Sequence, residues 1–159
     1  MTLGKYISPL GEITIAVEDD CLAGLWFERQ KYYGSEIKAD ASFGEHPLLD
    51  KTKEWLEVFF SGKEPEFSLP LAPARTESVA RVREAMLSIP YGSTISYSEL
   101  ALKAGMPLAV RAVAGMVARN PFIIMVPCHR IISKNGNLTG YAAGLDRKKK
   151  LLEIEHQSS

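Results

Sequence analysis

The chain has 159 residues, which fits one domain or two small lobes and excludes a large multidomain enzyme. Hydrophobic residues make up 46% and charged residues 24% of the sequence, a balance typical of folded globular proteins and not of disordered chains. Lys and Arg number 19, as do Asp and Glu, so the formal net charge is zero. Taken alone, that neutrality argues against a protein that binds nucleic acid.

The neutrality is the sum of two unequal halves. Residues 1–80 carry 8 basic and 14 acidic side chains, a net of −6, whereas residues 81–159 carry 11 basic and 5 acidic side chains, a net of +6. Such an asymmetry favours a C-terminal half that faces a polyanion. Chance clustering on a solvated surface is the alternative explanation, and charge alone does not separate the two.

The composition also bears on location and cofactors. No apolar run approaches the ~18 residues that span a membrane, and residues 1–6 lack the features of a signal peptide. Cys21 and Cys128 are the only cysteines; they are too few for a disulfide framework, so we expect a reducing, cytoplasmic location. The histidines and cysteines show no metal-ligand spacing, and we expect neither a metal nor another cofactor.

The first third of the chain predicts a small antiparallel sheet. Apolar-rich runs over residues 3–8, 12–18 and 21–27 are separated by turn signals, and each is short enough for a strand. Cys21 lies inside the third run and is expected to be a small buried hydrophobe. The polar residues 30–45 predict a loop.

A helix and a linker are expected next. His46, placed before a proline, predicts the cap of a helix over residues 47–60, whose apolar side chains keep helical spacing. Three prolines within residues 63–75 predict a linker between lobes. We therefore expect an N-terminal lobe over residues 1–70 and a C-terminal lobe over residues 76–159.

The second lobe is expected to be mainly helical. A helix is predicted from Thr76 to about residue 87, and Ser96 with Glu99 forms a capping box that begins a second helix. Pro107 fits the first turn of a third helix that runs to about Arg119. Two helices joined by a short glycine-containing turn suggest a helix-turn-helix, although many structural helix pairs share this pattern.

The third of these helices is unusual for a helix that reads DNA bases. Its side chains are small or apolar, and Arg111 is its only charge before Arg119, whereas a major-groove reader presents several polar side chains. Small residues such as Ala109 and Gly115 let a helix backbone approach another surface closely. The alternative is an ordinary surface arginine that keeps its charge in water.

A reactive type of triplet lies in the last third of the chain. The apolar residues 121–132, which predict a strand, are interrupted by Cys128-His129-Arg130. A thiol becomes a nucleophilic thiolate only beside a base or a positive charge, and His129 and Arg130 are immediate candidates. Adjacent strand side chains point to opposite faces, so Cys128 and His129 need either a turn or a bridging water to act together. A buried structural cysteine is the alternative.

Pro127-Cys128-His129-Arg130, with Asn120-Pro121 before it and residues 140–145 (Gly-Tyr-Ala-Ala-Gly-Leu) after it, resembles the O6-alkylguanine-DNA alkyltransferase family. The resemblance runs from Thr76 to Glu155, and the N-terminal lobe matches only in size and strand content. It implies an α+β fold, with a ribonuclease-H-like N-terminal lobe and a C-terminal lobe that carries a winged helix-turn-helix. Asn135-Gly136 is a hairpin signal that fits the wing.

The resemblance also implies catalytic roles. Cys128 would be the nucleophile, and His129 would take the thiol proton through a water molecule. Glu155, rather than the nearby Glu153, would hold the imidazole, in the manner of a Ser-His-Asp triad with a thiol nucleophile. Asn120 would brace the active-site turn; read without the family, it is a helix C-cap.

Further positions would bind the substrate. Tyr97 would contact a phosphate and help to rotate the nucleotide, Arg111 would replace the flipped base in the stack, and Tyr141 would donate to the guanine ring. Ala142 stands where some members have serine, so one hydrogen-bond donor to O6 is absent or replaced. The expected substrate and DNA contacts are Arg111, Tyr97, Arg130, Tyr141, Ala109 and Gly115, with Arg147 and Lys148–Lys150 as possible helpers or a solvated face.

The implied activity is that of a methylated-DNA–protein-cysteine methyltransferase, acting as a monomer on duplex DNA through the minor groove. The alkylated base would be flipped out and its alkyl group moved irreversibly to Cys128, one lesion per molecule.

The alternatives are a non-catalytic lesion-binding protein, a helix-turn-helix regulator and a cysteine hydrolase. Cys128 argues against the first, and the scarcity of polar residues around Arg111 argues against the second. A base immediately next to the nucleophile is unusual for the third. The acidic N-terminal lobe would be a scaffold turned away from DNA.

Overall fold

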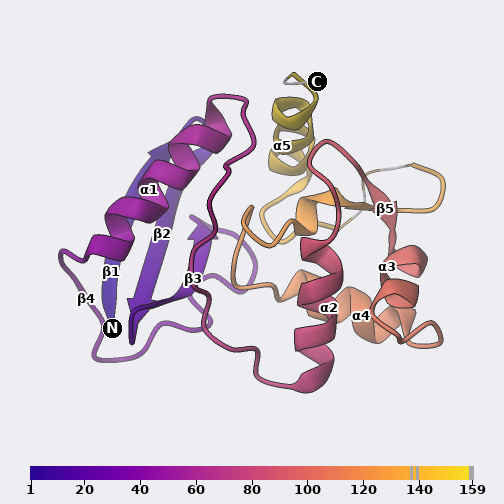
Figure 1. The fold of residues 1–159 in the computed structure, drawn as a ribbon, viewed down its shortest axis with the longest axis horizontal. Coiled ribbons are helices and arrows are strands. Elements are labelled where there is room, and N and C mark those ends of the chain that lie inside the picture. The colour runs from indigo at the N-terminus through magenta and orange to yellow at the C-terminus, as the bar shows by residue number, and fades with distance from the viewer. Residues whose placement is uncertain (137, 139, 158–159) are drawn as a thin grey trace.

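The computed structural model describes residues 1–136, 138 and 140–157. A small sheet with one helix lies on one side of the molecule, and a group of helices lies on the other (Figure 1). The C-terminal helix α5 (Leu145–Gln157) stands between the two groups at the top of this view. The α+β fold expected from the family resemblance is confirmed.

The three predicted strands form the body of the N-terminal sheet. They are β1 (Thr2–Ser8), β2 (Gly11–Glu18) and β3 (Cys21–Phe27), paired antiparallel as expected. A short strand, β4 (Ser42–Phe43), lies parallel to β1, which gives the strand order β3-β2-β1-β4 and a mixed sheet. The prediction of loop over residues 30–45 is wrong at β4, because two exposed residues show no alternation that a sequence pattern could reveal.

Helix α1 (Pro47–Phe60) packs on this sheet. The side chain of His46 accepts a hydrogen bond from the backbone N–H of Leu48, which confirms the predicted cap. Apolar spacing turns one face of α1 inward, where Leu56 and Phe59 are buried. This face matters below, because Phe59 reaches the second lobe.

The second half contains α2 (Glu77–Leu87), β5 (Ile95–Ser96), α3 (Tyr97–Lys103), α4 (Val110–Ala118) and β6 (Ile131–Ile132), as well as α5. The capping box of α3 is present, since Ser96 accepts from the Glu99 N–H and Glu99 accepts from the Ser96 N–H. Helix α4 begins later than predicted. Pro107 lies in the preceding turn, which the Ala109 N–H closes by donating to the Met106 carbonyl.

The predicted strand over residues 121–132 is wrong for most of its length. Residues 121–127 form turns, Cys128–Arg130 form one turn of 3₁₀ helix, and only Ile131–Ile132 are a strand, parallel to β5. Ile124 has a φ of 71°, a left-handed conformation that is strained for a β-branched residue. The apolar residues 121–127 thus form turns instead of a strand, because hydrogen bonds from the Asn120 side chain hold their backbone.

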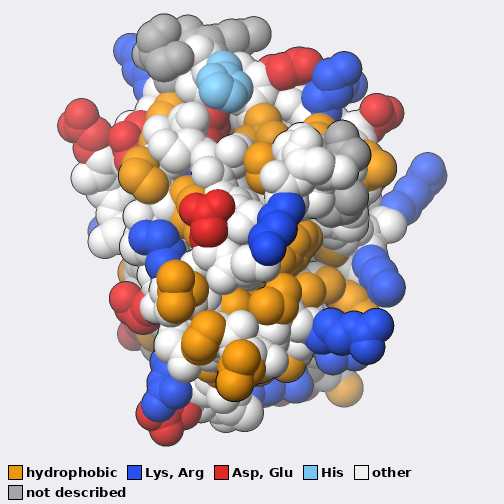
Figure 2. Space-filling model, turned by 90° about the vertical axis from the view of Figure 1, so that its right-hand side faces the viewer, with side chains coloured by type: hydrophobic (Ala, Val, Ile, Leu, Met, Phe, Trp, Pro, Cys, Tyr) orange, Lys and Arg blue, Asp and Glu red, His pale blue; other side chains and the backbone are white. Residues whose placement is uncertain are grey.

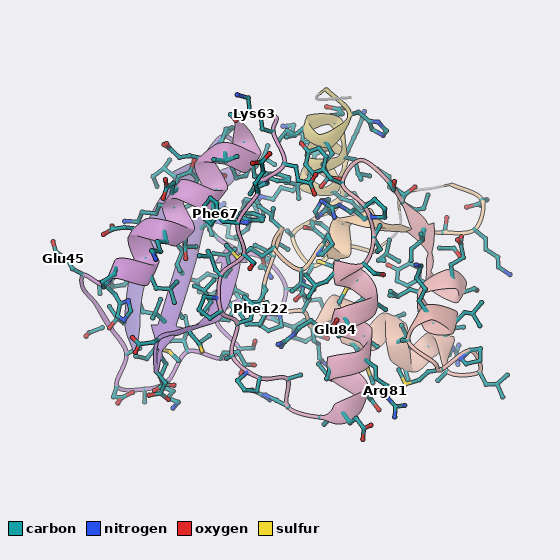
Figure 3. The ribbon with its side chains drawn as sticks, in the orientation of Figure 1. Glu45, Lys63, Phe67, Arg81, Glu84 and Phe122 are labelled. Carbon is teal, nitrogen blue, oxygen red and sulfur yellow. The ribbon has the colours of Figure 1, made fainter. Side chains whose placement is uncertain are left out.

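The outer edge of β3 pairs with both the linker and this turn. The Leu22 N–H donates to the Pro70 carbonyl, and the Ala72 N–H donates back to Leu22. Further along β3, the Leu25 N–H donates to the Pro121 carbonyl. Figure 3 shows Phe122 in the seam between the sheet and α2. The linker is thus held like a short strand, and the N-terminal lobe helps to position the turn that leads to Cys128.

One hydrophobic core continues through both halves. It includes Ile13 and Leu56 from the N-terminal half and Val113, Ile131 and Leu151 from the C-terminal half. The two halves therefore share buried contacts. The division into an N-terminal lobe over residues 1–70 and a C-terminal lobe over residues 76–159 stays a prediction.

The basic run at the start of α5 is not a uniform solvated face. The guanidinium of Arg147 donates to the carbonyls of Leu10 and Glu28 and lies over the Phe27 ring, 4.5 Å from its centroid. Lys148 is completely buried, at 0% exposure. Only Lys149 and Lys150 are exposed, so two of the four expected helpers in phosphate binding have other positions.

The contacts of Arg147 predict a role in stability. Replacing Arg147 by Met keeps much of the apolar contact with Phe27 but leaves two carbonyl oxygens without their charged donor. We expect the free energy of unfolding to fall by about 1–3 kcal/mol in urea denaturation. Lys149→Met removes one positive charge from an exposed position of the same helix. It should change the free energy of unfolding by less than about 0.5 kcal/mol. Equal stability of the two variants would contradict this assignment.

The wing is described only in part. The turn at Asn135-Gly136 is present, with the Gly136 N–H donating to the Ser133 carbonyl, but residues 137 and 139 lie outside the described residues. Among the residues that are described, no helix has the length and apolar character needed to cross a membrane.

Candidate active site

Asn120 organises the turn that leads to Cys128. Its side-chain N–H groups donate to the carbonyls of Phe122 (3.2 Å) and Val126 (2.9 Å) and to the Cys128 Sγ (3.3 Å), while its Oδ1 accepts from the Phe122 N–H (3.0 Å). One buried amide thus replaces the hydrogen bonds that a strand would have supplied. The bracing expected of Asn120 is a direct feature of the geometry.

Cys128 is a buried thiol in a mixed environment. It is 3% exposed, and this burial raises the pKa of its thiol, while the hydrogen bond from Asn120, the Tyr141 hydroxyl and the Lys148 ammonium act in the opposite direction. Lys148 lies 6.0 Å from the centroid of the Tyr141 ring, and burial lowers the pKa of its ammonium. The thiol is therefore protonated at rest, with groups around it that favour a thiolate once the proton has a destination.

A buried charge cluster includes the two residues that follow Cys128 in the chain. The His129 Nε2 donates to Glu155 Oε2 (2.6 Å), and Arg130 donates to both oxygens of the same carboxylate (2.8–3.0 Å). The backbone N–H of Gly92 donates to Glu155 Oε1 at 3.0 Å. His129 and Glu155 are both completely buried. The carboxylate predicted to hold the imidazole is thus in contact with it.

The charges within this cluster follow from these contacts. Burial alone would raise the pKa of Glu155, but hydrogen bonds from His129 and Arg130 lower it to about 2. Burial lowers the pKa of His129 despite the adjacent carboxylate. His129 is therefore neutral: its Nε2–H donates to the Glu155 carboxylate, and its buried Nδ1 makes no hydrogen bond within the described part of the chain. A neutral imidazole with a free nitrogen is a competent base.

Arg130 has a structural position different from the one expected. It was predicted to contact substrate or DNA, but its donors are directed to Glu155 and to the Ile89 carbonyl (2.8 Å), and its side chain is only 12% exposed. Its guanidinium also lies over the ring of Tyr91. The sequence carries no signal for this pairing, because 25 residues separate the two partners.

The N-terminal half covers the same cluster. The ring of Phe59, from α1, meets the His129 imidazole edge to face at 6.2 Å. Sequence reasoning missed this residue because Phe59 is one of several apolar side chains on an amphipathic helix. The N-terminal lobe is therefore part of the wall that keeps the imidazole out of water.

Tyr97 and Tyr141 lie near enough to Cys128 to interact with it electrostatically. Charge on Cys128 acts on both hydroxyls: burial first, and then this proximity, raises the pKa of each tyrosine, that of Tyr141 well above its usual value. The Tyr97 hydroxyl donates to the Gly140 carbonyl at 3.5 Å. The loop that carries Tyr141 is held from the other half, since the Lys31 N–H donates to the Ala142 carbonyl at 2.8 Å.

Helix α4 carries the arginine that was expected to contact DNA. Arg111 is exposed and, among the residues that the structure describes, its guanidinium has no hydrogen-bond or ion-pair partner. Ala109 and Gly115 are half-buried, and open space lies beside Gly115. Figure 2 shows the face of the molecule on this side, where Lys and Arg side chains surround exposed hydrophobic ones.

The cluster has the groups needed for nucleophilic substitution. Within residues 1–136, 138 and 140–157, no group of three or more His, Cys, Asp or Glu side chains is placed to hold a metal ion. A thiol, a neutral imidazole, an ionised carboxylate and a buried ammonium together suit transfer of a group to sulfur.

Comparison with protein families gives two matches that together cover most of the chain. Residues 77–157 match the family model described as "6-O-methylguanine DNA methyltransferase, DNA binding domain". Residues 1–73 match the model described as "6-O-methylguanine DNA methyltransferase, ribonuclease-like domain".

Individual relatives agree with these matches. A methylated-DNA–protein-cysteine methyltransferase of Methanosarcina barkeri is 42% identical over 151 residues, covering 95% of this chain and 94% of that protein. The constitutive enzyme of Bacillus subtilis is 40% identical over 153 residues, covering 95% and 93%. The crystal structure of Mycobacterium tuberculosis OGT in complex with DNA superposes with a TM-score of 0.89 at 35% identity, covering 100% of this chain and 95% of that one.

Proposed function

Because the chain belongs to the 6-O-methylguanine DNA methyltransferase family, we propose that it repairs alkylated DNA by moving the alkyl group from guanine O6 to the sulfur of Cys128. The observation that carries this proposal is the set of buried residues Cys128, His129 and Glu155, in which a protonated thiol is followed in the chain by a neutral, carboxylate-held imidazole. The relatives that carry this activity in their names cover nearly the whole chain.

The first step is activation of the thiol. His129 takes the proton of Cys128 at its free Nδ1 through one water molecule, because its Nε2 already donates to Glu155. The ionised Glu155 then stabilises the imidazolium. The Lys148 ammonium and the Asn120 N–H stabilise the thiolate as it forms.

The second step is direct displacement. The thiolate attacks the alkyl carbon, the new S–C bond forms as the C–O6 bond breaks, and the electron pair passes to the purine. Tyr141 keeps its proton, because burial and Cys128 raise its pKa, and its hydroxyl donates a hydrogen bond to the departing guanine. A thioether has no leaving group for water to displace under these conditions, so each molecule reacts once.

The remaining site residues bind the DNA. Tyr97 contacts the phosphate of the rotated nucleotide, and Arg111 enters the stack in place of the flipped base. Ala109 and Gly115 let α4 lie close to the minor groove, and Asn120 positions Cys128. Flipping costs a few kcal/mol, which phosphate contacts and the new stacking offset. The C-terminal half, with its excess of basic residues, faces the duplex.

We also propose that the protein acts as a monomer in the cytoplasm, without a cofactor. A reducing compartment keeps the thiol of Cys128 available, since an oxidised cysteine cannot attack an alkyl carbon. Every bond made or broken in the reaction belongs to the protein, the lesion or water.

The test is intact-mass measurement after incubation with duplex DNA that contains one O6-methylguanine. We expect each protein molecule to gain one CH₂ unit, as S–H becomes S–CH₃, on the peptide that contains Cys128. Cys128→Ala should gain nothing, and Cys21→Ala should react like the wild type, because Cys21 lies in β3.

The outcomes separate the proposal from its alternatives. Tight binding of the lesion without a mass gain would indicate a lesion-binding protein that does no chemistry. A methyl group on the Cys128→Ala variant would exclude Cys128 as the acceptor. Methyl transfer beyond one equivalent would overturn the single-turnover reaction while leaving the nucleophile in place.

A further inference from the structure

The residue just before α4 carries a side chain that neither the fold nor the reaction above explains. Leu108 is 100% exposed, the highest value among the exposed large hydrophobic side chains of the described residues. Single exposed leucines are common on protein surfaces and need no special reason. The position of this one, however, adds a second observation.

Leu108 and Arg111 are the protruding side chains at the start of α4. Leu108 precedes Ala109, the N-cap residue, and Arg111 lies in the first turn. Between them, Ala109 and Val110 are half-buried, whereas Leu108 and Arg111 are exposed. A hydrocarbon side chain and a guanidinium are thus both exposed at the start of α4, three residues apart in the chain.

We propose that Leu108 is an apolar DNA contact, which packs against the sugar edges and base floor of the minor groove beside the nucleotide that Arg111 displaces. This inference rests on the proposed function. Proteins that bind the minor groove commonly place apolar side chains such as leucine against or between base steps. A major-groove position would instead need several hydrogen-bonding side chains, whereas Arg111 is the one such side chain on α4. Leu108 therefore adds affinity that depends on neither charge nor base sequence.

The salt dependence of binding distinguishes this role from an electrostatic one. Affinity is measured by fluorescence anisotropy on duplex DNA with one O6-methylguanine, in a Cys128→Ala background that binds without reacting. We expect Leu108→Ala to weaken binding about 10-fold at every salt concentration between about 50 and 200 mM, with the salt slope unchanged. Arg111→Ala should instead make the slope shallower by about 0.9.

Two control variants isolate the leucine. Leu108→Met keeps the apolar volume and should bind like the parent protein. Ile7→Ala removes a branched side chain that is 75% exposed on β1, in the other half of the molecule, and should leave affinity unchanged. Equal affinities of Leu108→Ala and its parent would overturn the inference, and so would a loss accompanied by a shallower salt slope.

A second substrate separates this inference from the proposed function. With Cys128 restored, transfer from free O6-benzylguanine base should proceed at the same rate in Leu108→Ala and wild type, whereas transfer from subsaturating DNA should be slower in the variant. A slower reaction with the free base as well would place Leu108 in the reaction itself and overturn a DNA-contact role. Failure of the wild type with both substrates would instead overturn the proposed function.

Discussion

Glu155→Gln is expected to slow single-turnover alkyl transfer by about four powers of ten, as expected when a triad carboxylate loses its charge. The amide keeps the shape of the side chain but not its charge, so the imidazolium formed at His129 has no counter-ion. The amide also presents an N–H group to donors on His129 and Arg130, which cannot accept it in their present protonation states. The measurement is rapid-quench transfer at saturating O6-methylguanine DNA.

The same variant is expected to lose about 3–5 kcal/mol of stability, because it leaves the largely buried Arg130 without an anion. Glu153→Gln is the matched control. Glu153 lies two residues away on the same helix and is exposed, so both rate and stability should stay within experimental error. Similar effects of the two substitutions would contradict the assignment of Glu155 to the cluster.

The pH dependence follows with a definite sign. The pKa of Glu155 falls from an ordinary 4.5 to about 2 on folding, so its contribution to stability is complete above pH 4.5 and is lost as pH falls toward 2. The pKa of His129 is also lowered on folding, which adds loss of stability as pH falls below 6.5. Urea midpoints should therefore drop steeply in acid for the wild type and less steeply for Glu155→Gln. Parallel curves would contradict this origin.

The sequence was most informative where a local pattern determines the structure. The strands of the N-terminal sheet and the caps at His46 and Ser96 were predicted from neighbouring residues. These features depend on alternation and on capping side chains, and each of them is contained within a few residues. Family resemblance then added Glu155, which no local pattern would have selected.

The remaining features depend on side-chain and strand-edge contacts that the spacing of residue types does not reveal. The apolar residues 121–127 suggested a strand, but the side chain of Asn120 and the edge of β3 hold them as turns. A run of four basic residues suggested a solvated face, but Lys148 packs inside and Arg147 reaches two carbonyls of the other half. Sequence spacing alone carries no information about partners that lie more than a hundred residues away.

Asn120→Ala is expected to lower the free energy of unfolding by about 2–4 kcal/mol, because it leaves several buried backbone groups of the active-site turn without hydrogen bonds. The Phe122 N–H and the Phe122 and Val126 carbonyls all lose a partner, and the left-handed Ile124 loses the groups that fix its strained conformation. Asn135→Ala, at an exposed turn, serves as the stability control in urea denaturation and should change little.

Asn120→Asp separates the electrostatic part of this role from the structural part. The carboxylate still accepts from the Phe122 N–H, but its second oxygen replaces the N–H group that donates to the Cys128 Sγ. A negative charge there raises the thiol pKa further, so the pH profile of Cys128 alkylation by iodoacetamide should move to higher pH more in the Asp than in the Ala variant. If Asn120 only supported the turn, the Ala variant would be the more affected in both stability and pH profile. If Asn120 also stabilises the thiolate, the pH profile of alkylation should move further in the Asp variant than in the Ala variant, whatever the order of their stabilities.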